Sequence, residues 1–475
     1  MTEEHTYLEL SEDNGTAHKY YEVTISGTTV TISYGRIGTA GQERVSTFPT
    51  LEKARAAAEK KLNEKLRKGY APAQRGVRQA RPVSRRTIVS SRSTAKQAPV
   101  LWRFDSGAAA FGIYVDDDRC MVGNQRGDIF KVTHSGEVVG HFSLPDGVKC
   151  LVADDFWLYA GCDDGRVYDL SGKIPRVAYE ISADVDIFWL DVDDATLGVS
   201  DRNGRITAID HEDEFQWARD VTGNDAWMVR CDADAVYHGH SRGVARYDTG
   251  DGTPRWESNV NGNVLFGWQE RDSVYAGTGR GEVYRLAKAD GAVEARYRCD
   301  SAVYSCATSP QGRFVFAGDD ESSIYCFDEN GERLWKLGTG CGSAFSMQFH
   351  GDRLYIVTTS GALACLDASP AAIEAAQAGQ LPTATTVKAP PTLAAVAPSV
   401  ELETVTYDGD GVIVECFRDG AKLRVRAVSD GFEASWNVQF PKDIRQPGAR
   451  YVVDGLRASE RGGFYRSYGE IRRLR

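Results

Sequence analysis

The sequence predicts a mainly β protein in which a seven-bladed β-propeller is preceded by a small α+β module and followed by a small β-rich module. Three observations support this. A phrase of strand, glycine turn and strand recurs seven times in the middle of the chain, two stretches with few large apolar residues flank the repeats, and the charge changes sign along the chain. The expected domains are residues 1–70, a basic flexible linker 71–98, the propeller 99–370, a Pro/Ala/Thr linker 371–400 and the last module 401–475.

The repeated phrase determines the predicted fold of the middle segment. Its turn residues, which are spaced by 38, 39, 39, 38, 42 and 38, are Gly127, Gly165, Gly204, Gly243, Gly281, Ser323 and Gly361. A period near 40 with strand–turn–strand content is that of a propeller blade. The sixth repeat continues into an outer strand at Leu334-Trp335, whereas the seventh ends at Asp367 without one. We expect the strand 100–107 to supply the missing strand and to close the last blade.

The repeats resemble those of pyrroloquinoline-quinone-like and WD-like propellers. The shared phrase is a glycine turn, a strand ending in Leu-Asp, a short loop and a tryptophan; the tryptophan position is held here by Trp102, Trp217, Trp256 and Trp335. Quinone-dependent dehydrogenases belong to the propellers with this type of repeat, and they generally have eight blades and two adjacent cysteines. This chain has seven repeats and no adjacent cysteines. No quinone or other cofactor is therefore expected, and the tryptophans are expected to pack between blades.

Charge is unevenly distributed along the chain. The net charge is −11, yet residues 1–98 have 17 Lys and Arg against 10 Asp and Glu, and residues 99–370 have 25 against 44. Because an anionic propeller repels a phosphate backbone, nucleic-acid contact is expected from the ends of the chain. The segment 69–98 contains seven cations and no acid, which favours salt-dependent attraction of polyanions. The simpler interpretation of this segment is a solvated tether.

The first 70 residues are predicted to form strands followed by one helix. Alternating apolar residues indicate strands at 20–25, 28–34 and 44–48. Thr50 then caps a helix whose apolar positions are Leu51, Ala54, Ala58, Leu62 and Leu66.

This module resembles a WGR domain, which is named for its Trp-Gly-Arg signature. The matching stretches are His18-Lys19-Tyr20-Tyr21, the run 34–42 (Tyr-Gly-Arg-Ile-Gly-Thr-Ala-Gly-Gln), Thr47-Phe48 and Lys68-Gly69-Tyr70. In poly(ADP-ribose) polymerases this domain binds DNA near strand breaks, so the resemblance implies DNA binding, with breaks or ends as candidate targets. The residues predicted to contact DNA are Lys19, Tyr34, Gly35, Arg36, Gln42, Lys68 and Tyr70.

Two positions depart from the WGR pattern. Tyr34 stands at the signature tryptophan, and His18 stands at an asparagine. A tyrosine still stacks on a sugar or base with a smaller face, and Arg36 still suits a bidentate phosphate contact. The departures put selectivity for breaks in question. A WGR fold used only for protein contact is the alternative, and ADP-ribosylation is not expected because no polymerase catalytic segment follows.

Residues 401–475 show alternating strands and no family pattern. The tail mixes aromatic residues with arginines, namely Arg461, Arg466, Arg472, Arg473 and Arg475. Such a mixture suits nucleic-acid contact. It equally suits a small barrel whose aromatic residues form the core.

Neither a catalytic constellation nor a metal-binding pattern is found in the sequence. The ten cysteines form no Cys-x-x-Cys pair and are expected to be buried thiols in a reducing compartment. His238 and His240 share one face of a strand, but a third ligand cannot be named, so no metal site is expected. The N-terminus does not resemble a signal peptide, and there is no apolar run of about 18 residues. A cytoplasmic location is expected, with association with the nucleoid as an alternative and no membrane contact.

The sequence therefore predicts a DNA-binding adaptor without enzymatic activity. Residues 1–98 contact DNA through the WGR-like module and the basic linker, and the acidic propeller binds a protein partner. The alternative is a pure protein-interaction scaffold in a bacterial regulatory or defence complex, without DNA binding. A third hypothesis is an enzyme whose site lies in the central channel of the propeller.

Overall fold

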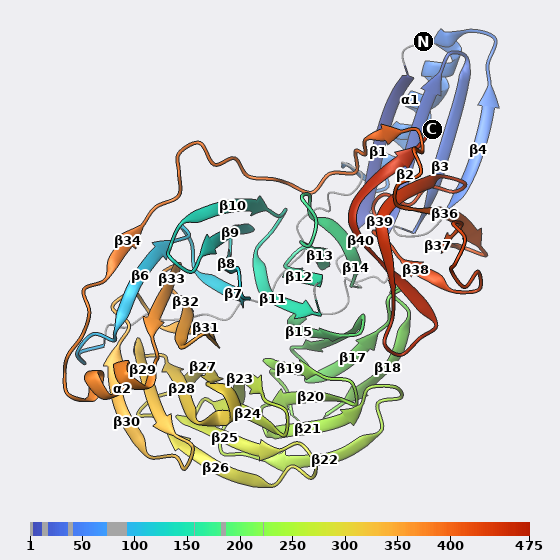
Figure 1. Ribbon diagram of the computed structural model, residues 1–475. Helices are drawn as coiled ribbons and strands as arrows, with labels where there is room; N and C mark the ends of the chain where they lie inside the picture. The colour runs from blue at the N-terminus through green and yellow to red at the C-terminus, as the bar shows by residue number, and fades with distance from the viewer. Residues whose placement is uncertain are drawn as a thin grey trace. The chain divides into compact units, whose positions relative to one another are not determined.

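A computed structural model describes residues 3–11, 18–36, 41–73, 93–155, 157–181, 187–221 and 223–475. The contacts between residues divide the chain into two compact units. One unit contains Met1–Arg81, Asp164–Val185 and Pro398–Arg475, and the other contains Pro82–Asp163 and Asp186–Ala397. Strands dominate both units, which confirms the mainly β fold (Figure 1).

The N-terminal module is a five-stranded sheet with one helix. Its elements are β1 (Glu3–Ser11), β2 (His18–Ser26), β3 (Thr29–Arg36), β4 (Gln42–Thr47), α1 (Leu51–Leu66) and β5 (Ala71–Pro72), with the sheet order β4-β3-β2-β1-β5. The side chain of Thr50 accepts a hydrogen bond of 3.3 Å from the backbone N–H of Lys53, so the helix begins at the predicted cap. Sequence periodicity identified β2, β3, β4 and α1, and it did not identify β1 or β5.

Helix α1 covers one face of this sheet through its smallest residues. Ala54 and Ala58 are completely buried against Tyr21, Val23 and Val30 of the sheet. Alanine at the contact lets the helix backbone approach the strands closely. The apolar stripe predicted for α1 is wrong at both ends, because the side chains of Leu51 and Leu66 are about 40% exposed.

The repeat region forms seven sheets in the described part of the chain. The first sheet contains β7 (Ala110–Val115), β8 (Arg119–Asn124), β9 (Asp128–Thr133) and β10 (Val138–Ser143). The second contains β11 (Val148–Asp154), β12 (Trp157–Cys162), β13 (Arg166–Asp169) and β14 (Arg176–Glu180). The third contains β15 (Ile187–Asp193), β16 (Thr196–Asp201), β17 (Arg205–Ile209) and β18 (Phe215–Asp220). The next two contain β19 (Met228–Cys231), β20 (Ala235–His240), β21 (Gly243–Asp248) and β22 (Pro254–Asn259), and β23 (Val264–Gln269), β24 (Ser273–Thr278), β25 (Glu282–Ala287) and β26 (Val293–Arg298).

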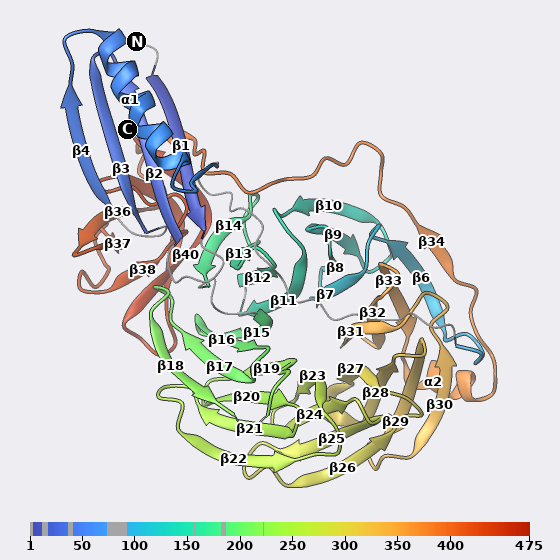
Figure 2. The ribbon, with the colours of Figure 1, turned by 180° about the vertical axis from the view of Figure 1, so that it is seen from behind.

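The last two sheets complete the repeat region. The sixth contains β27 (Val303–Thr308), a 3-10 turn η1 (Pro310–Gly312), β28 (Phe314–Asp319), β29 (Ser323–Asp328) and β30 (Arg333–Gly338). The seventh contains β31 (Ala344–His350), β32 (Arg353–Thr358), β33 (Ala362–Asp367), β6 (Val100–Asp105) and β34 (Thr385–Val387). The first strands contact one another in the order β7, β11, β15, β19, β23, β27, β31 and back to β7, so they surround a common axis (Figures 1 and 2).

Strand β6 joins the front of the repeat region to its end. It pairs antiparallel with β33, with Phe104 opposite Leu363 and Trp102 opposite Cys365. The side chains of Trp102 and Phe104 are at most 4% exposed. Burial of two large aromatic side chains in this sheet makes the contact a strong one.

Residues 371–400 contain more regular structure than the predicted linker. Helix α2 (Pro370–Gln377) begins at a Ser369 cap and buries Ile373 and Ala376, and β34 pairs in parallel with β6. The prediction of a plain spacer is therefore wrong for these stretches. Composition missed them because β34 depends on the backbone groups that the edge of β6 offers, which a local sequence pattern does not reveal.

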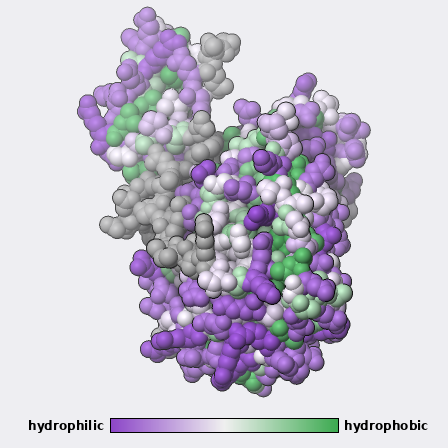
Figure 3. All heavy atoms as spheres, turned by 90° about the vertical axis from the view of Figure 1, so that its left-hand side faces the viewer, coloured by the Kyte–Doolittle hydropathy of each residue, from purple (hydrophilic) through white to green (hydrophobic). Residues whose placement is uncertain are grey.

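The side of the repeat region that carries β6 and β34 is largely hydrophilic, with hydrophobic residues in separate small groups (Figure 3).

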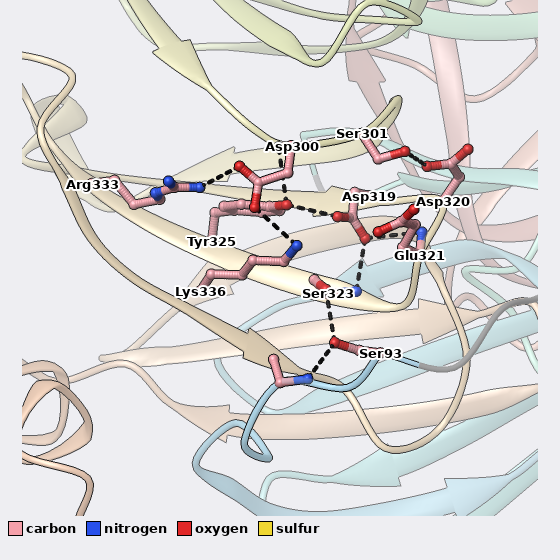
Figure 4. A network of polar contacts seen from close by, with 11 residues as sticks. Ser93, Asp300, Ser301, Asp319, Asp320, Glu321, Ser323, Tyr325, Arg333 and Lys336 are labelled. Atoms are coloured by element: carbon pink, nitrogen blue, oxygen red, sulfur yellow. Dashed lines mark hydrogen bonds and ion pairs between the residues drawn. The ribbon is translucent and has the colours of Figure 1, made fainter.

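An acidic side chain at the end of the second strand stabilises the hairpin that follows. In the sixth sheet, Asp319 accepts hydrogen bonds from the backbone N–H groups of Glu321 (3.0 Å) and Ser323 (2.8 Å) and from the hydroxyl of Tyr325 (2.8 Å), as Figure 4 shows. This is the local turn chemistry for which Asp and Asn are favoured. The corresponding residues in two other sheets are Asn124 and Asp201.

The repeated tryptophans pack between neighbouring sheets, as predicted. The indole N–H donates to a backbone carbonyl 32 residues ahead, from Trp102 to His134 at 3.0 Å and from Trp217 to Thr249 at 2.8 Å. Trp256 makes the same bond to Lys288 at 2.9 Å. In these three positions the indole donor is satisfied by the next sheet, whereas Trp335 is buried and its indole N–H has no hydrogen-bond partner among the described residues.

The C-terminal module is a small closed sheet. Its strands are β35 (Thr404–Val405), β36 (Val412–Asp419), β37 (Lys422–Ala427), β38 (Asn437–Gln439), β39 (Arg450–Ala458) and β40 (Phe464–Leu474). The pairing runs β39-β36-β37-β38-β40 and returns from β40 to β39, while β35 adds to β40. Its core contains Val414, Val425 and Tyr451. The arginines of the tail are partly internal: Arg466 is 3% exposed, and Arg472 is paired with Asp454 at 3.0 Å.

All ten cysteines are free thiols, and eight of them are buried. Within the described ranges no helix is both long and apolar enough to cross a membrane. The same residues contain no group of three or more His, Cys, Asp or Glu side chains arranged to hold a metal ion.

Candidate nucleic-acid interface

The strand register brings several predicted DNA-contacting residues onto the helix-covered face of the N-terminal sheet. Tyr34 of β3 lies opposite Tyr21 of β2 on one side and opposite Gln42 of β4 on the other. Paired residues of antiparallel strands point to the same face. Tyr21 is buried beneath α1, so Tyr34 and Gln42 extend this face outward to the edge strand β4.

A lysine from the last turn of α1 completes an aromatic cluster on this face. The Nζ of Lys65 lies 4.6 Å from the ring centroid of Tyr21, 5.2 Å from that of Tyr70 and 6.0 Å from that of Tyr34. The ring centroid of Tyr21 is 6.0 Å from that of Tyr34 and 6.3 Å from that of Tyr70. An ammonium over an aromatic ring contributes about 0.5–2 kcal/mol, more as water is excluded. We call Tyr21, Tyr34, Lys65 and Tyr70 the lysine–tyrosine cluster.

Burial and neighbouring charges shift the pKa values in the lysine–tyrosine cluster. Burial lowers the pKa of Lys65, and the positive charges of Lys68, Lys61 and Lys19 lower it further, against an opposite effect of Glu64. Burial also raises the pKa of Tyr21, as does the charge of Glu64. Both shifts oppose the charged forms in a partly dehydrated site. An anion arriving next to Lys65 relieves the repulsion among these cations.

Further cations surround the cluster. Lys19 and Arg44 are exposed on the strands of the same face, and Lys61 and Lys68 are exposed on and just after α1. Glu64 is paired with Lys68 at 3.0 Å and with Lys61 at 3.4 Å. One carboxylate among these exposed lysines and Arg44 leaves an excess of positive charge, which suits a phosphate backbone.

The structure places the predicted residues as follows. Tyr34, Gln42 and Tyr70 meet at the lysine–tyrosine cluster, and the hydroxyl of Tyr34 donates a 2.7 Å hydrogen bond to the Oε1 of Gln42. Lys19 lies opposite Arg36 in the register of β2 and β3, and Gly35 lies opposite Tyr20. Lys68 is held by its ion pair with Glu64.

Two predictions fall outside the described residues. The first concerns Arg36, whose side chain is not described, as is also true of the loop 37–40. The second concerns the basic linker, of which residues 74–92 are not described. The predicted contacts of Arg36 and the linker with DNA remain predictions.

Lys65 and Tyr21 were not predicted as site residues. The helical period could have identified Lys65. Ala54, Ala58 and Leu62 face the sheet, and the next position on that face is residue 65 or residue 66, three or four residues after Leu62. Hydrophobicity alone favours Leu66 as the residue that faces the sheet. In the structure Lys65 faces the sheet, and Leu66 is exposed. Tyr21 is identified by its alternation with buried Val23 and Ile25.

Comparisons with known proteins agree with this organisation. The fold and the repeats define a β-propeller protein: residues 240–386 and 320–439 match the family model described as Outer membrane protein assembly factor BamB, which consists of PQQ-like repeats. More particularly, residues 4–77 match the WGR domain model, so the chain has a WGR domain followed by a β-propeller. No protein with a curated description matches the chain significantly.

Two solved structures to which the chain is similar share little sequence identity with it. The WD40 β-propeller domain of Doa1 is 11% identical with a TM-score of 0.48, and the match covers 59% of this chain and 99% of that one. The computationally designed Ika8 protein is 14% identical with a TM-score of 0.42, over 57% of this chain and 99% of that one.

Proposed function

We propose that this protein is a DNA-binding adaptor. Its WGR domain, with the basic linker behind it, contacts DNA at breaks or ends, and its seven-bladed, acidic propeller binds a protein partner. It acts by binding, without catalysis. The lysine–tyrosine cluster is the observation that carries this proposal.

The chemistry of the cluster supports DNA contact. Tyr34 and Tyr70 are only half-buried, so part of each ring is available to stack on a sugar or base. Lys19, Arg44 and Lys65 surround these rings with positive charge. Aromatic faces combined with cations are the usual components of sites that bind unstacked or terminal nucleotides. A terminus or nick offers such nucleotides, whereas an intact duplex offers only its backbone and grooves.

Binding of labelled duplexes by the full chain tests this proposal. Fluorescence anisotropy is measured with nicked, blunt-ended and circular intact DNA, for the wild type, for Lys19→Gln/Lys65→Gln and for the charge-matched control Lys53→Gln/Lys60→Gln. Lys53 and Lys60 are exposed on α1 outside the cluster. The expected result is tighter binding of nicked and blunt DNA, weakened about tenfold or more by the cluster substitutions and within about twofold for the control. Absence of DNA binding, or equal loss in both variants, would overturn the proposal.

The scaffold alternative is supported by a different feature, the outer strand β4. All six of its residues are exposed, and Val45 is 59% exposed. An edge strand of this kind offers unpaired backbone groups to a strand of another protein. If Val45→Lys abolishes assembly with a partner while the cluster variant has no effect on any function, the scaffold explanation replaces DNA binding.

A further inference from the structure

Four neighbouring sheets of the propeller enclose a cavity at one end of their innermost strands. Its volume is about 260 Å³, and its lining comes from the last residues of β11, β15, β19 and β23 and from the turn after β11. These strands contact one another in that order around the propeller. An apolar cavity of about 150 Å³ already holds a benzene ring. The space is therefore large enough for a long side chain of another molecule.

Carboxylates outnumber cations in and around this cavity. Its lining contains one arginine, Arg230, and four aspartates, namely Asp154, Asp155, Asp191 and Asp193. The turns between the first and second strands of the same sheets contain one further arginine, Arg271, and six acidic residues, namely Asp155, Asp194, Asp232, Asp234, Glu270 and Asp272. Of these, Asp232 is paired with Lys288 at 2.8 Å. The remaining excess of negative charge favours a cation in the cavity.

The protein's own guanidinium shows how this environment holds a cation. The Nε and Nη2 of Arg230 donate to the backbone carbonyl of Gly267 at 2.9 and 2.7 Å. Its Cζ lies 5.6 Å from the ring centroid of Phe266 and 5.8 Å from that of Trp268. Its Nη1 is 4.0 Å from the carboxylate of Asp191. Arg230 offsets one of the four lining carboxylates, so the cavity retains room and charge for a second cation.

The walls of the cavity are held in place by hydrogen bonds. The indole N–H of Trp268 donates to the hydroxyl of Thr308 at 3.0 Å. The side-chain amide of Gln269 donates to the carbonyl of Cys231 at 2.8 Å and accepts from the ammonium of Lys288 at 3.0 Å. Groups fixed in this way lose little freedom when a ligand binds. The indole also offers a flat apolar surface to the methylene groups of a lysine or arginine.

An added cation changes the protonation of one carboxyl of the cavity. The side chain of Asp191 is 10% exposed, and its burial, with a smaller effect of Asp154, raises its pKa to about 6. Arg230 and the backbone N–H of Cys231, which donates at 2.9 Å, oppose this shift. The neighbouring thiols of Cys150 and Cys231 have pKa values raised by burial and stay neutral. Because a second cation favours the ionised form of Asp191, its binding is expected to strengthen as the pH rises through about 6.

We propose that this cavity, the acidic cavity, is the docking site for a basic segment of a partner protein, one Lys or Arg side chain of which enters it. This rests on the proposed function, in which the propeller binds a protein partner, and it names the end of the propeller and the charge of that partner. The cavity provides an anchor pocket of the kind found at the centre of interfaces. The acidic turns around it attract cations that flank the anchor, so a chain segment gains more than an isolated amine.

Selection from a random peptide library displayed on phage, with the full chain immobilised, tests the occupant. We expect enriched peptides to be basic and to share one Lys or Arg. Selected peptides are then titrated calorimetrically against the wild type, Asp155→Asn/Asp193→Asn, and the control Glu329→Gln/Glu332→Gln, whose exposed carboxylates lie in the turn between β29 and β30, outside the cavity. Asparagine tolerates the positive φ of Asp155. Neutralisation in the cavity, or replacement of the shared Lys or Arg by Gln, is expected to weaken binding about tenfold or more, against less than about twofold for the control.

A pH series distinguishes insertion into the cavity from attraction to the surface around it. The affinity of the wild type for a selected peptide is expected to rise as the pH increases through about 6, since Lys and Arg stay charged while Asp191 ionises. Asp191→Asn keeps an acceptor for the N–H of Cys231 and is expected to lose most of this rise. A pH dependence that Asp191→Asn leaves unchanged places the peptide outside the cavity and overturns the inference.

Other outcomes also overturn it: enrichment of acidic peptides, no enrichment, or equal effects of the two carboxylate pairs. Spermidine is titrated as a free polyamine, and its binding to the cavity in the absence of any selected peptide makes the occupant a small amine. DNA binding through the lysine–tyrosine cluster is measured on the same preparations. Retained DNA binding with no peptide binding rejects the cavity inference alone, whereas loss of DNA contact in a chain that still binds basic peptides rejects the adaptor proposal.

Discussion

The hydroxyl of Tyr34 donates a 2.7 Å hydrogen bond to the Oε1 of Gln42, across the pair of strands β3 and β4. These two residues flank the loop 37–40 and lie opposite each other in the strand register. The bond fixes the outer end of the tyrosine, while the inner side of its ring lies against Tyr21. A tyrosine at the position of the signature tryptophan is thereby held in one orientation by the edge strand.

Tyr34→Phe separates the roles of ring and hydroxyl. The substitution removes a partly exposed hydrogen bond, which costs about 0.5–1.5 kcal/mol, and leaves the stacking face. We expect the affinity for nicked DNA to fall only a few-fold for Tyr34→Phe and about tenfold or more for Tyr34→Ala, as measured by anisotropy. Equal losses in both variants would show that the hydroxyl, and not the ring, makes the contact.

Thr50→Ala removes the cap of α1. The side chain of Thr50 accepts from the N–H of Lys53 at 3.3 Å, so its loss is expected to destabilise the helix by about 1 kcal/mol. Hydrogen–deuterium exchange of residues 51–58 in the full chain measures this as faster exchange. Thr50→Asp, which keeps a cap acceptor, serves as the control. Protection that is unchanged in Thr50→Ala would mean that packing alone sets the start of the helix.

The period of the repeats was sufficient to predict the sheets, because each hairpin depends on local turn residues. Gly127, Gly165, Gly204 and Gly361 all have φ between 85° and 90°, as their places in the repeat predict. At the sixth repeat, the positive φ belongs to Ser322 and not to the predicted turn residue Ser323. Strand β34 was missed because its pairing with β6 joins residues nearly 300 positions apart.

The candidate site was predicted less completely than the fold. Tyr34, Gln42 and Tyr70 follow from the family resemblance, and the structure brings them together. Lys65 was missed because a lysine next to the apolar face of a helix is normally expected to be exposed to solvent. Its long side chain instead places the ammonium group near three tyrosine rings.

His238 makes the stability of the propeller dependent on pH. Burial, with a smaller effect of His240, lowers the pKa of His238 to about 3, and neither ring nitrogen has a hydrogen-bond partner among the described residues. In the unfolded chain its pKa is about 6.5. Stability is therefore fully present above about pH 6.5 and falls as the pH drops toward 3, by up to about 1.4 kcal/mol per pH unit.

Thermal unfolding of the wild type and His238→Leu between pH 7 and pH 4 measures this dependence. The variant is expected to lose less stability than the wild type as the pH falls, since leucine takes up no proton. Other groups titrate equally in both proteins and cancel in the comparison. Parallel curves for the two proteins would show that His238 takes up its proton equally in the folded and unfolded states, so that its folded-state pKa is not lowered.

Strand β6 is expected to contribute strongly to the stability of the propeller. Trp102 is 4% exposed, its ring centroid lies 6.3 Å from that of Tyr355 in a tilted arrangement, and its indole donates to His134, so Trp102→Ala is expected to cost about 3–5 kcal/mol. Leu101→Ala on the same strand is the control, because Leu101 is only half-buried. Scanning calorimetry of the full chain is expected to show a much larger drop of the propeller transition for Trp102→Ala. Equal drops would indicate that β6 is dispensable for ring closure.

The salt dependence of DNA binding shows whether the lysine–tyrosine cluster holds the phosphate backbone. The association constant of the full chain for a nicked duplex is measured from 50 to 300 mM salt, because each neutralised phosphate contributes about −0.9 to the slope of log K against log salt. We expect a slope of several units in the wild type and a slope smaller by about one to two units in Lys19→Gln/Lys65→Gln. A wild-type slope near zero, or a slope that the two substitutions leave unchanged, would contradict it.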